Sequence, residues 1–399
     1  MKFTKMSLVA ALLVGSSAFA IENTKISGDA KLFYGTTQDT TDLFNKAGST
    51  AQTAVSISVS TDLTKGVSFG GKATALSTLG LEGQLVGNVW EAPNGLSDSY
   101  IVNDLWLAAT AGKTTVKLGR MELDTPLVFT ESWSIVENTF EAAVVINTDI
   151  PNTTLVGAYV GGSNGSEDER VASDLSNPHT ATTAAGVIGA EAANTTFDQF
   201  YAGAYAIGVI NNSWKPLTAQ AWYYNASKNA TAYWVQADLN IDGIMLGAQF
   251  AGEDLSKVAP TLEANTVYAI MAGYEMKDTF TAKLSYSAVS DDAGRGAGSN
   301  LAASGQSKLY TEAWWNYGKI TQADTTAFNL TVEAPVKDIV DLGLYATMAD
   351  CETDTGDMTE VTITASHSFG PLDTTAAVVY TDANDDKSGT VQAYLTYNF

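Results

Sequence analysis

Two histidines and one cysteine are the side chains in this sequence best suited to catalysis or transition-metal binding: His179, His367 and Cys351. A hydrolase would need a histidine held in fixed geometry against a serine or an acid. Ser366 and Ser368 flank His367, but neighbours on a strand point to opposite faces. Two distant histidines make a poor metal site, and one cysteine excludes a disulfide framework. No phosphate-binding glycine loop lies between a strand and a helix, so we expect no enzyme activity.

The chemistry that remains is electrostatic. The 399 residues include 44 Asp and Glu against 21 Lys and Arg, which gives a net charge of −23. A nucleic-acid partner is therefore not expected, because such proteins need a basic face. The apolar fraction of 45% is too high for a disordered acidic chain. The elements that position these carboxylates must come from a folded scaffold.

Residues 1–20 read as a secretory signal peptide. Lys2 and Lys5 form the charged region, residues 6–15 form the apolar region, and Ala18-Phe19-Ala20 has the small-x-small cleavage pattern. The apolar run is shorter than the ~20 residues of a membrane-spanning helix. No later segment is long and apolar, so residues 21–399 are expected to be either a secreted soluble domain or a closed transmembrane β-barrel.

From residue 24 onward the dominant hydrophobic period is two. Val55, Ile57 and Val59, for example, alternate with serines, and similar runs cover 26–34, 233–241 and 280–288. Runs of about ten residues match a tilted membrane strand and exceed the ~5–6 residues of a soluble strand. This pattern predicts an all-β, antiparallel barrel.

Short turn signals alternate with longer polar segments. The turns lie near 62–66, 111–114, 149–152, 211–216, 240–243, 276–279, 334–338 and 369–373. The longer segments lie near 35–50, 77–98, 121–138, 164–197, 226–230, 252–264, 291–323, 349–357 and 381–388. Eight turns and nine outer loops separate 18 strands, an even number as in bacterial barrels. We leave the count open by two strands, with 16 as an alternative, because residues 309–318 could hold a hairpin.

The last strand places Leu395, Tyr397 and Phe399 on one face. An alternating apolar row that ends in Phe resembles the C-terminal signal by which outer-membrane barrels engage the assembly machinery. The alternative, a secreted β-sandwich, would bury Val, Ile, Leu and Phe at inward positions. Here the apolar rows contain many small residues, such as Gly157, Gly203 and Ala282, which favours the barrel.

Residues 118–128 (LGRMELDTPLV), followed by 137–142 (ENTFEA), resemble porins of the OprD type and the related campylobacterial major outer-membrane porins. The resemblance implies an 18-stranded barrel, usually a homotrimer, whose third loop folds into the lumen. On that analogy residues 121–138 form a constriction loop that carries Glu122, Asp124, Glu131 and Glu137. OprD-type channels guide carboxylates along an arginine ladder, but this chain has three arginines in all, so carboxylate specificity is not carried over.

The alternation also assigns charges to the water-filled side of the wall. By strand parity the candidate pore-lining residues are Asp29, Lys31, Lys72, Lys117, Glu141, Asp238, Lys283, Glu333 and Asp341. With the acidic third loop, this mixed wall predicts a channel that prefers cations, because negative charge at a constriction concentrates cations and repels anions.

The outer loops are acidic as well, at residues 167–169, 291–292, 350–357 and 382–386. Dense oxygen ligands of this kind can bind Ca²⁺ or Mg²⁺ and bridge to lipopolysaccharide phosphates. The 350–357 segment, however, lacks the glycine and the glutamate of a calcium-binding loop, and a solvated acidic surface is the simpler interpretation.

Together these features predict a trimeric outer-membrane porin for passive diffusion of ions and small hydrophilic solutes, without a cofactor. The alternatives are a surface adhesin, which would form no pore, and a barrel hydrolase that depends on His367.

Overall fold

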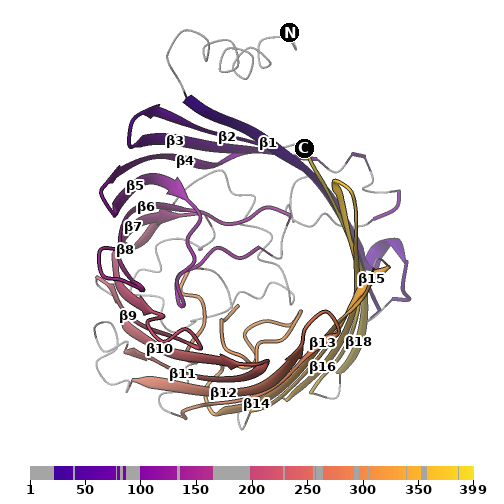
Figure 1. Cartoon of the computed structure of the whole chain (residues 1–399). Helices are drawn as coiled ribbons and strands as arrows, with labels where there is room; N and C mark the ends of the chain where they lie inside the picture. Colours follow the sequence, from indigo (N-terminus) through magenta and orange to yellow (C-terminus); the bar gives the residue numbers. More distant parts are fainter. Residues whose placement is uncertain are drawn as a thin grey trace.

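The computed structural model is a closed, antiparallel barrel of 18 strands (Figure 1). It describes residues 22–38, 41–77, 79–80, 84–86, 99–132, 135–164, 198–227, 230–254, 257, 264–291, 296–302, 306–337, 339–351, 357–384 and 386–399. The expected signal peptide, residues 1–20, lies outside this part. Strand β1 pairs with both β2 and β18, which closes the sheet. The predicted fold and strand count are therefore confirmed.

The strands follow one another around the barrel in chain order. Their bounds are β1 (Glu22–Gln38), β2 (Ser49–Thr64), β3 (Val67–Ser77), β4 (Ser99–Ala111), β5 (Thr114–Met121), β6 (Phe140–Asn147), β7 (Thr153–Ser163), β8 (Asp198–Asn211), β9 (Leu217–Ala226), β10 (Ala230–Ile241), β11 (Ile244–Asp254), β12 (Asn265–Met276), β13 (Phe280–Val289), β14 (Thr325–Val336), β15 (Val340–Cys351), β16 (Met358–Phe369), β17 (Leu372–Ala383) and β18 (Asp386–Asn398).

Each strand has one apolar outward row and one inward row. On β2, the outward Val55 is 46% exposed, whereas the inward Ser56 is 2% exposed and shares a hydrogen bond with Thr74. A barrel that crosses a bilayer around a water-filled lumen needs this arrangement, because its outer surface contacts the lipid hydrocarbon.

The short turns lie at one end of the barrel, as predicted, because successive strands run in opposite directions. In the described part of the chain, the one helical element is the 3₁₀ turn Lys46–Gly48, and no helix is long and apolar enough to cross a membrane. The 291–323 segment forms no named strand there; an isolated bridge joins Ser299 to Ser307.

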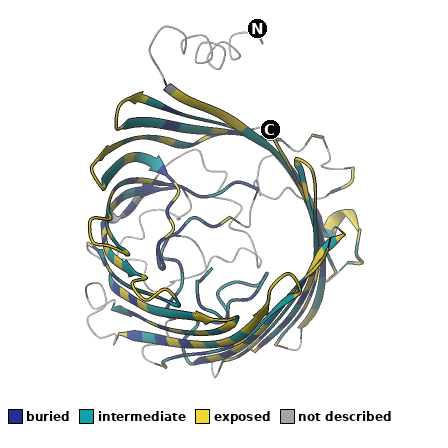
Figure 2. Ribbon diagram, in the orientation of Figure 1, coloured by how far each residue is buried: buried dark blue, intermediate teal, exposed yellow. Residues whose placement is uncertain are grey.

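Two loops fold back into the barrel instead of extending from it (Figure 1). Loop L3 (residues 122–139, described except for 133–134) connects β5 to β6, and loop L7 (residues 290–324, described except for 292–295 and 303–305) connects β13 to β14. Figure 2 shows that the segments crossing the lumen carry many of the buried residues. The hydrophobic core of this barrel therefore lies between the inner wall and these loops, and not between two sheets.

Candidate functional site

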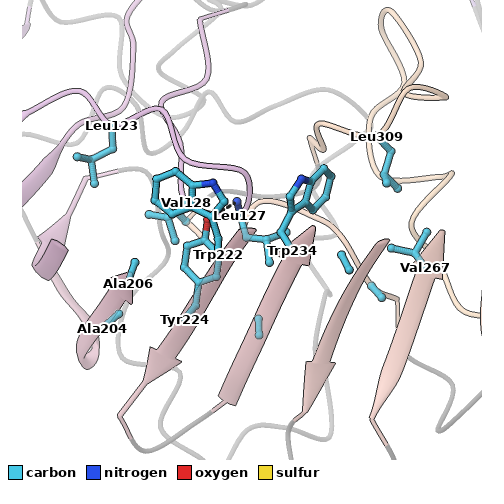
Figure 3. Close-up of a cluster of buried hydrophobic side chains, with 14 of the residues drawn as sticks. Leu123, Leu127, Val128, Ala204, Ala206, Trp222, Tyr224, Trp234, Val267 and Leu309 are labelled. Atoms are coloured by element: carbon cyan, nitrogen blue, oxygen red, sulfur yellow. Dashed lines mark hydrogen bonds between the residues drawn. The ribbon is translucent and has the colours of Figure 1, made fainter. Parts of the chain in front are cut away.

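Loop L3 enters the lumen as expected and is held there by apolar contacts on two sides. Leu127 and Val128 pack with Trp222, Tyr224 and Trp234 of the facing wall (Figure 3). The Leu127 backbone N–H also donates to the Tyr224 hydroxyl at 3.3 Å. Burying these side chains is worth about 1.5–3 kcal/mol each, which fixes the loop against the wall.

The returning half of L3 docks on the other side of the barrel. Ile135 and Val136 are buried with a second group of side chains, Phe33, Ala54, Leu76 and Ile101 on β1–β4. L3 therefore spans the lumen from one wall to the other. The apolar residues 127–129 and 135–136 are the sequence signal for this docking, which the charge pattern does not reveal.

Loop L7 forms hydrogen bonds with the tip of L3. The Asn300 side-chain amide donates to the Phe129 carbonyl and to Glu131 Oε1, both at 2.9 Å. The Leu301 backbone N–H donates to the Leu127 carbonyl at 2.8 Å, and Lys308 forms an ion pair with Asp124. The two inward loops thus form one unit. Sequence reasoning missed Asn300 because its partners lie about 170 residues away.

We expect Asn300→Ala to loosen this unit. The change removes both donors to L3 and leaves the buried Glu131 carboxyl without one of its partners, at a cost of about 1–3 kcal/mol. Single-channel recording should show a noisier open current than wild type. The matched control is Asn398→Ala, since Asn398 bonds near the turn end of the barrel; equal noise in both variants would contradict the role of Asn300.

The four predicted constriction carboxylates have different environments. Glu137 accepts hydrogen bonds from Lys31 at 2.6 Å and Lys72 at 2.9 Å; we call these three residues the Glu137 cluster. Burial opposes ionisation of Glu137, but the two lysines more than offset it and hold the pKa of its carboxyl below the ordinary value. Glu122 is half exposed, 3.6 Å from Lys72.

Glu131 and Asp124 are also partnered. Glu131 is 2% exposed and accepts the Asn300 bond, whereas Asp124 pairs with Lys308, whose ammonium also lies 4.8 Å from the Phe129 ring centre. Much of the negative charge of L3 is therefore balanced by lysines or bonded to the other loop. This balance depends on folding and is invisible in the sequence.

Strand alternation places most of the predicted wall charges on the inner row. These are Asp29, Lys31, Lys72, Lys117, Asp238, Lys283, Glu333 and Asp341. Asp238 accepts a hydrogen bond from the Tyr310 hydroxyl, and Glu333 accepts one from Tyr345 at 2.9 Å. The Lys117 ammonium lies 4.3 Å from the centre of the Trp106 ring. Their role in conduction stays a prediction.

Asp104 belongs to the same inner row and was not predicted. An irregularity in the pairing of β3 with β4 aligns Lys72 with Asp104 and Ala73 with Val102, so simple parity fails along β4. A bulge of this kind carries no clear sequence signal.

The prediction that Glu141 lines the pore is wrong. Phe140 packs inward against Phe200, with ring centres 6.2 Å apart, and Ala142 and Val144 are buried on the same inner row. Glu141 therefore points outward, where its carboxylate lies 3.0 Å from Arg120 Nε. Phe140, the first residue after L3, sets this register because its large apolar side chain packs inward against Phe200 of β8.

The last strand has the outward row that the sequence predicted. Leu395, Tyr397 and Phe399 are 37%, 47% and 58% exposed. The Phe399 backbone exchanges two hydrogen bonds with Gly28 of β1, at 2.7 and 2.9 Å. These bonds extend the β1–β18 seam to the end of the chain; recognition by the assembly machinery stays a prediction.

The residues considered for catalysis form no site in the described part of the chain. The His367 ring lies 4.3 Å from the Phe369 ring, and Ser366 bonds to Thr375. Cys351 is buried and contacts the Ala323 carbonyl. No group of three or more metal-ligating side chains occurs among the described residues. His179 and most of the acidic loop residues, including 167–169, 292, 352, 354 and 385, lie outside them, so calcium binding stays a prediction.

No known family model matches this sequence, and no curated protein matches it significantly. Solved structures match it over nearly its whole length. Pseudomonas aeruginosa OccK8 (OprE) is 15% identical, with a TM-score of 0.70, over 96% of this chain and 99% of that one. P. aeruginosa OpdK with vanillate is 11% identical, with a TM-score of 0.74, over 95% and 99%.

Acinetobacter baumannii OccAB1 is 13% identical, with a TM-score of 0.72, over 96% of this chain and 97% of that one. The chain has the OprD-type porin fold. At these identities the similarity establishes a shared architecture, including closure at 18 strands. It does not transfer the solutes of those channels, which depend on particular wall residues.

Proposed function

We propose that this protein is an outer-membrane porin, not an enzyme, which forms a water-filled channel for passive diffusion of ions and small hydrophilic solutes. The observation that carries the proposal is the apolar outer row of the barrel together with an inner row that carries charged side chains on many of the strands. Loops L3 and L7 narrow the bore that this wall surrounds. Width and wall charge then set selectivity.

We further propose that the channel prefers cations. With Asp104 included, five of the wall charges named above are carboxylates and four are lysines, and the half-exposed Glu122 adds a further carboxylate at the constriction. Among the described residues the one arginine, Arg120, points outward and adds no positive charge to the bore. The bore is therefore net acidic, which raises the local concentration of cations.

Recordings across a planar bilayer test both proposals. We expect discrete conductance steps and, in a KCl gradient, a reversal potential displaced toward the potassium equilibrium potential, more strongly at low salt because screening is weaker. A chloride-selective sign would refute the charge argument. Absence of steps would refute the channel and support a surface adhesin.

The outward ion pair of Arg120 and Glu141 supports an association of barrels, for which we propose the homotrimer implied by the family resemblance. Arg120 lies about seven residues above the β4–β5 turn, which places it on the order of 15 Å into the wall. Its outward neighbours Leu105 and Leu118 are each 52% exposed. An arginine facing lipid at mid-height costs about 2–4 kcal/mol, whereas an interface between protomers can shelter the pair.

We expect the double change Arg120→Leu with Glu141→Leu to shift the detergent-solubilised protein from trimer toward monomer, as measured by light scattering. Leucines suit lipid better than an ion pair, so the barrel itself should remain folded. Leu330→Ala on β14, across the barrel, is the control, because Leu330 is an outward side chain far from this face. An unchanged mass in the double variant would place the pair outside the interface.

A further inference from the structure

The lumen contains a cavity of about 490 Å³ between loop L7 and the inner wall. Six of its lining residues are aromatic: Tyr310, Trp314, Trp315 and Tyr317 from L7, Tyr345 from β15 and Tyr394 from β18, the strand that pairs with β1. This volume lies within the usual range of small-molecule sites. The charged residues of the pore wall give no role to these aromatic side chains.

Three of the rings lie next to one another in a series. The Trp314 ring centre lies 6.4 Å from that of Trp315 and 6.4 Å from that of Tyr345, with interplanar angles of 33° and 34°. All three side chains are part-exposed and line the cavity. Trp315 and Tyr394 also pack against the buried cluster that holds the returning half of L3. Packing against this cluster therefore restrains the Trp315 and Tyr394 rings.

Polar side chains lie beside the rings, and hydrogen bonds to one another fix their orientation. Asn329 donates to Thr347 Oγ1 at 2.9 Å and accepts from the Thr331 hydroxyl at 2.9 Å, while Tyr345 donates to Glu333. The hydroxyl oxygens of Thr331 and Tyr345 can still accept a hydrogen bond from a solute. A fixed network of this kind binds hydroxyl groups with little loss of entropy.

The charge of the cavity lining does not favour an anionic solute. Among the described residues that line the cavity there is no lysine or arginine. Glu312 is the one carboxyl in the lining, and burial raises its pKa to about 8 even though the N–H groups of Ser307 and Ala313 favour its ionised form. Near neutral pH the cavity is therefore aromatic, rich in hydroxyls and free of positive charge.

We propose that this cavity is a binding site for neutral saccharides. A pyranose ring presents C–H faces that stack on Trp and Tyr rings, and an equatorial rim of hydroxyls that the surrounding polar groups can bond. The inference rests on the proposed channel function and names a solute class for it. The site holds a mono- or disaccharide on its passage and so favours its flux at low concentration.

Single-channel recording with maltose tests the proposal. Maltose added to the bath should interrupt the open current of the wild-type channel transiently, with a measurable binding constant. Trp314→Ala and Tyr345→Ala should each weaken that constant about tenfold, because each removes a stacking face. Trp314→Phe keeps a ring and should retain most of the binding. Trp106→Ala removes a tryptophan on β4, away from the cavity, and should leave binding unchanged.

The recordings separate failure of the saccharide site from failure of the channel itself. Channels that conduct but show no block by maltose would overturn the saccharide site and leave the porin function standing, whereas no conductance at all would remove the porin function itself. Block by benzoate that exceeds block by maltose would show an anionic aromatic site instead. If Trp314→Ala gives no channels, Tyr345→Ala and Trp314→Phe still decide the matter, since equal binding in wild type and Tyr345→Ala contradicts the stacking role.

Discussion

Glu137→Gln is expected to shift the channel toward anions and to destabilise the barrel. The change leaves the ammonium groups of Lys31 and Lys72 in the lumen without their shared carboxylate. Losing one partner of a largely buried ion pair costs about 3–5 kcal/mol. The reversal potential in a KCl gradient should move toward chloride, and urea-induced unfolding should occur at lower denaturant.

Glu122→Gln is the matched control for the Glu137 cluster. It removes one negative charge from the same loop, but the Glu122 side chain is 50% exposed and 3.6 Å from Lys72. We expect a smaller change in selectivity and little loss of stability, since exposed pairs contribute ~0–1 kcal/mol. If the two variants behave alike, the cluster has no special role and only the total charge matters.

The stability contributed by Glu137 should depend on pH in a defined direction. The lysines lower the pKa of its carboxyl below the ordinary 4.5. The contribution is therefore fully present above pH 4.5 and is lost as the pH falls through the lowered pKa of the folded state. The stability difference between wild type and Glu137→Gln should accordingly shrink in acid, which unfolding curves at several pH values can measure.

Gly28→Val is expected to reduce the amount of folded barrel sharply. A Cβ atom on Gly28 would lie 2.5 Å from the Phe399 ring and 2.5 Å from the Ser56 carbonyl oxygen. The ring can turn, but the carbonyl belongs to the neighbouring strand and cannot move without breaking the β1–β2 pairing. Overpacking of this kind costs about 1–3 kcal/mol, and it occurs at the seam that closes the barrel.

Gly157→Val supplies the comparison, because a Cβ atom at Gly157 would meet nothing within 4 Å. Both glycines lie on the outward row of a strand. Folded and unfolded barrels separate on gels run without heating, so the folded fraction of each variant can be measured directly. A similar folded fraction in both variants would mean that the space over Gly28 is not required.

The wall of this barrel was predictable because it depends on a local pattern. A period of two and turn residues such as those at 240–243 predict about 18 strands, with 16 left open, and the structure has 18 in chain order. Inward and outward assignment also succeeded wherever alternation was unbroken, as at Lys31 and Phe399. It failed at Glu141, where the packing of Phe140 decides the register, and it missed Asp104, which follows a bulge.

The interior was less predictable because its contacts join distant parts of the chain. The partners of Glu137 lie 106 and 65 residues away, and Asn300 meets Glu131 across 169 residues. The sequence therefore predicted that L3 turns inward, from its resemblance to known porins, but not that its carboxylates are partnered. Residues 309–318, which the sequence leaves open as a hairpin, form no strand in the structure, and several of them line the cavity.

The double attachment of loop L3 has a consequence for the order of assembly. Its docking sites are Phe33 on β1, Leu76 and Ile101 on β3 and β4, and Trp222 and Trp234 on β9 and β10. These sites face one another only after the sheet has curled into a cylinder. We therefore expect the bore to stay wide while the wall inserts into the bilayer and to acquire its final diameter as the last event of folding.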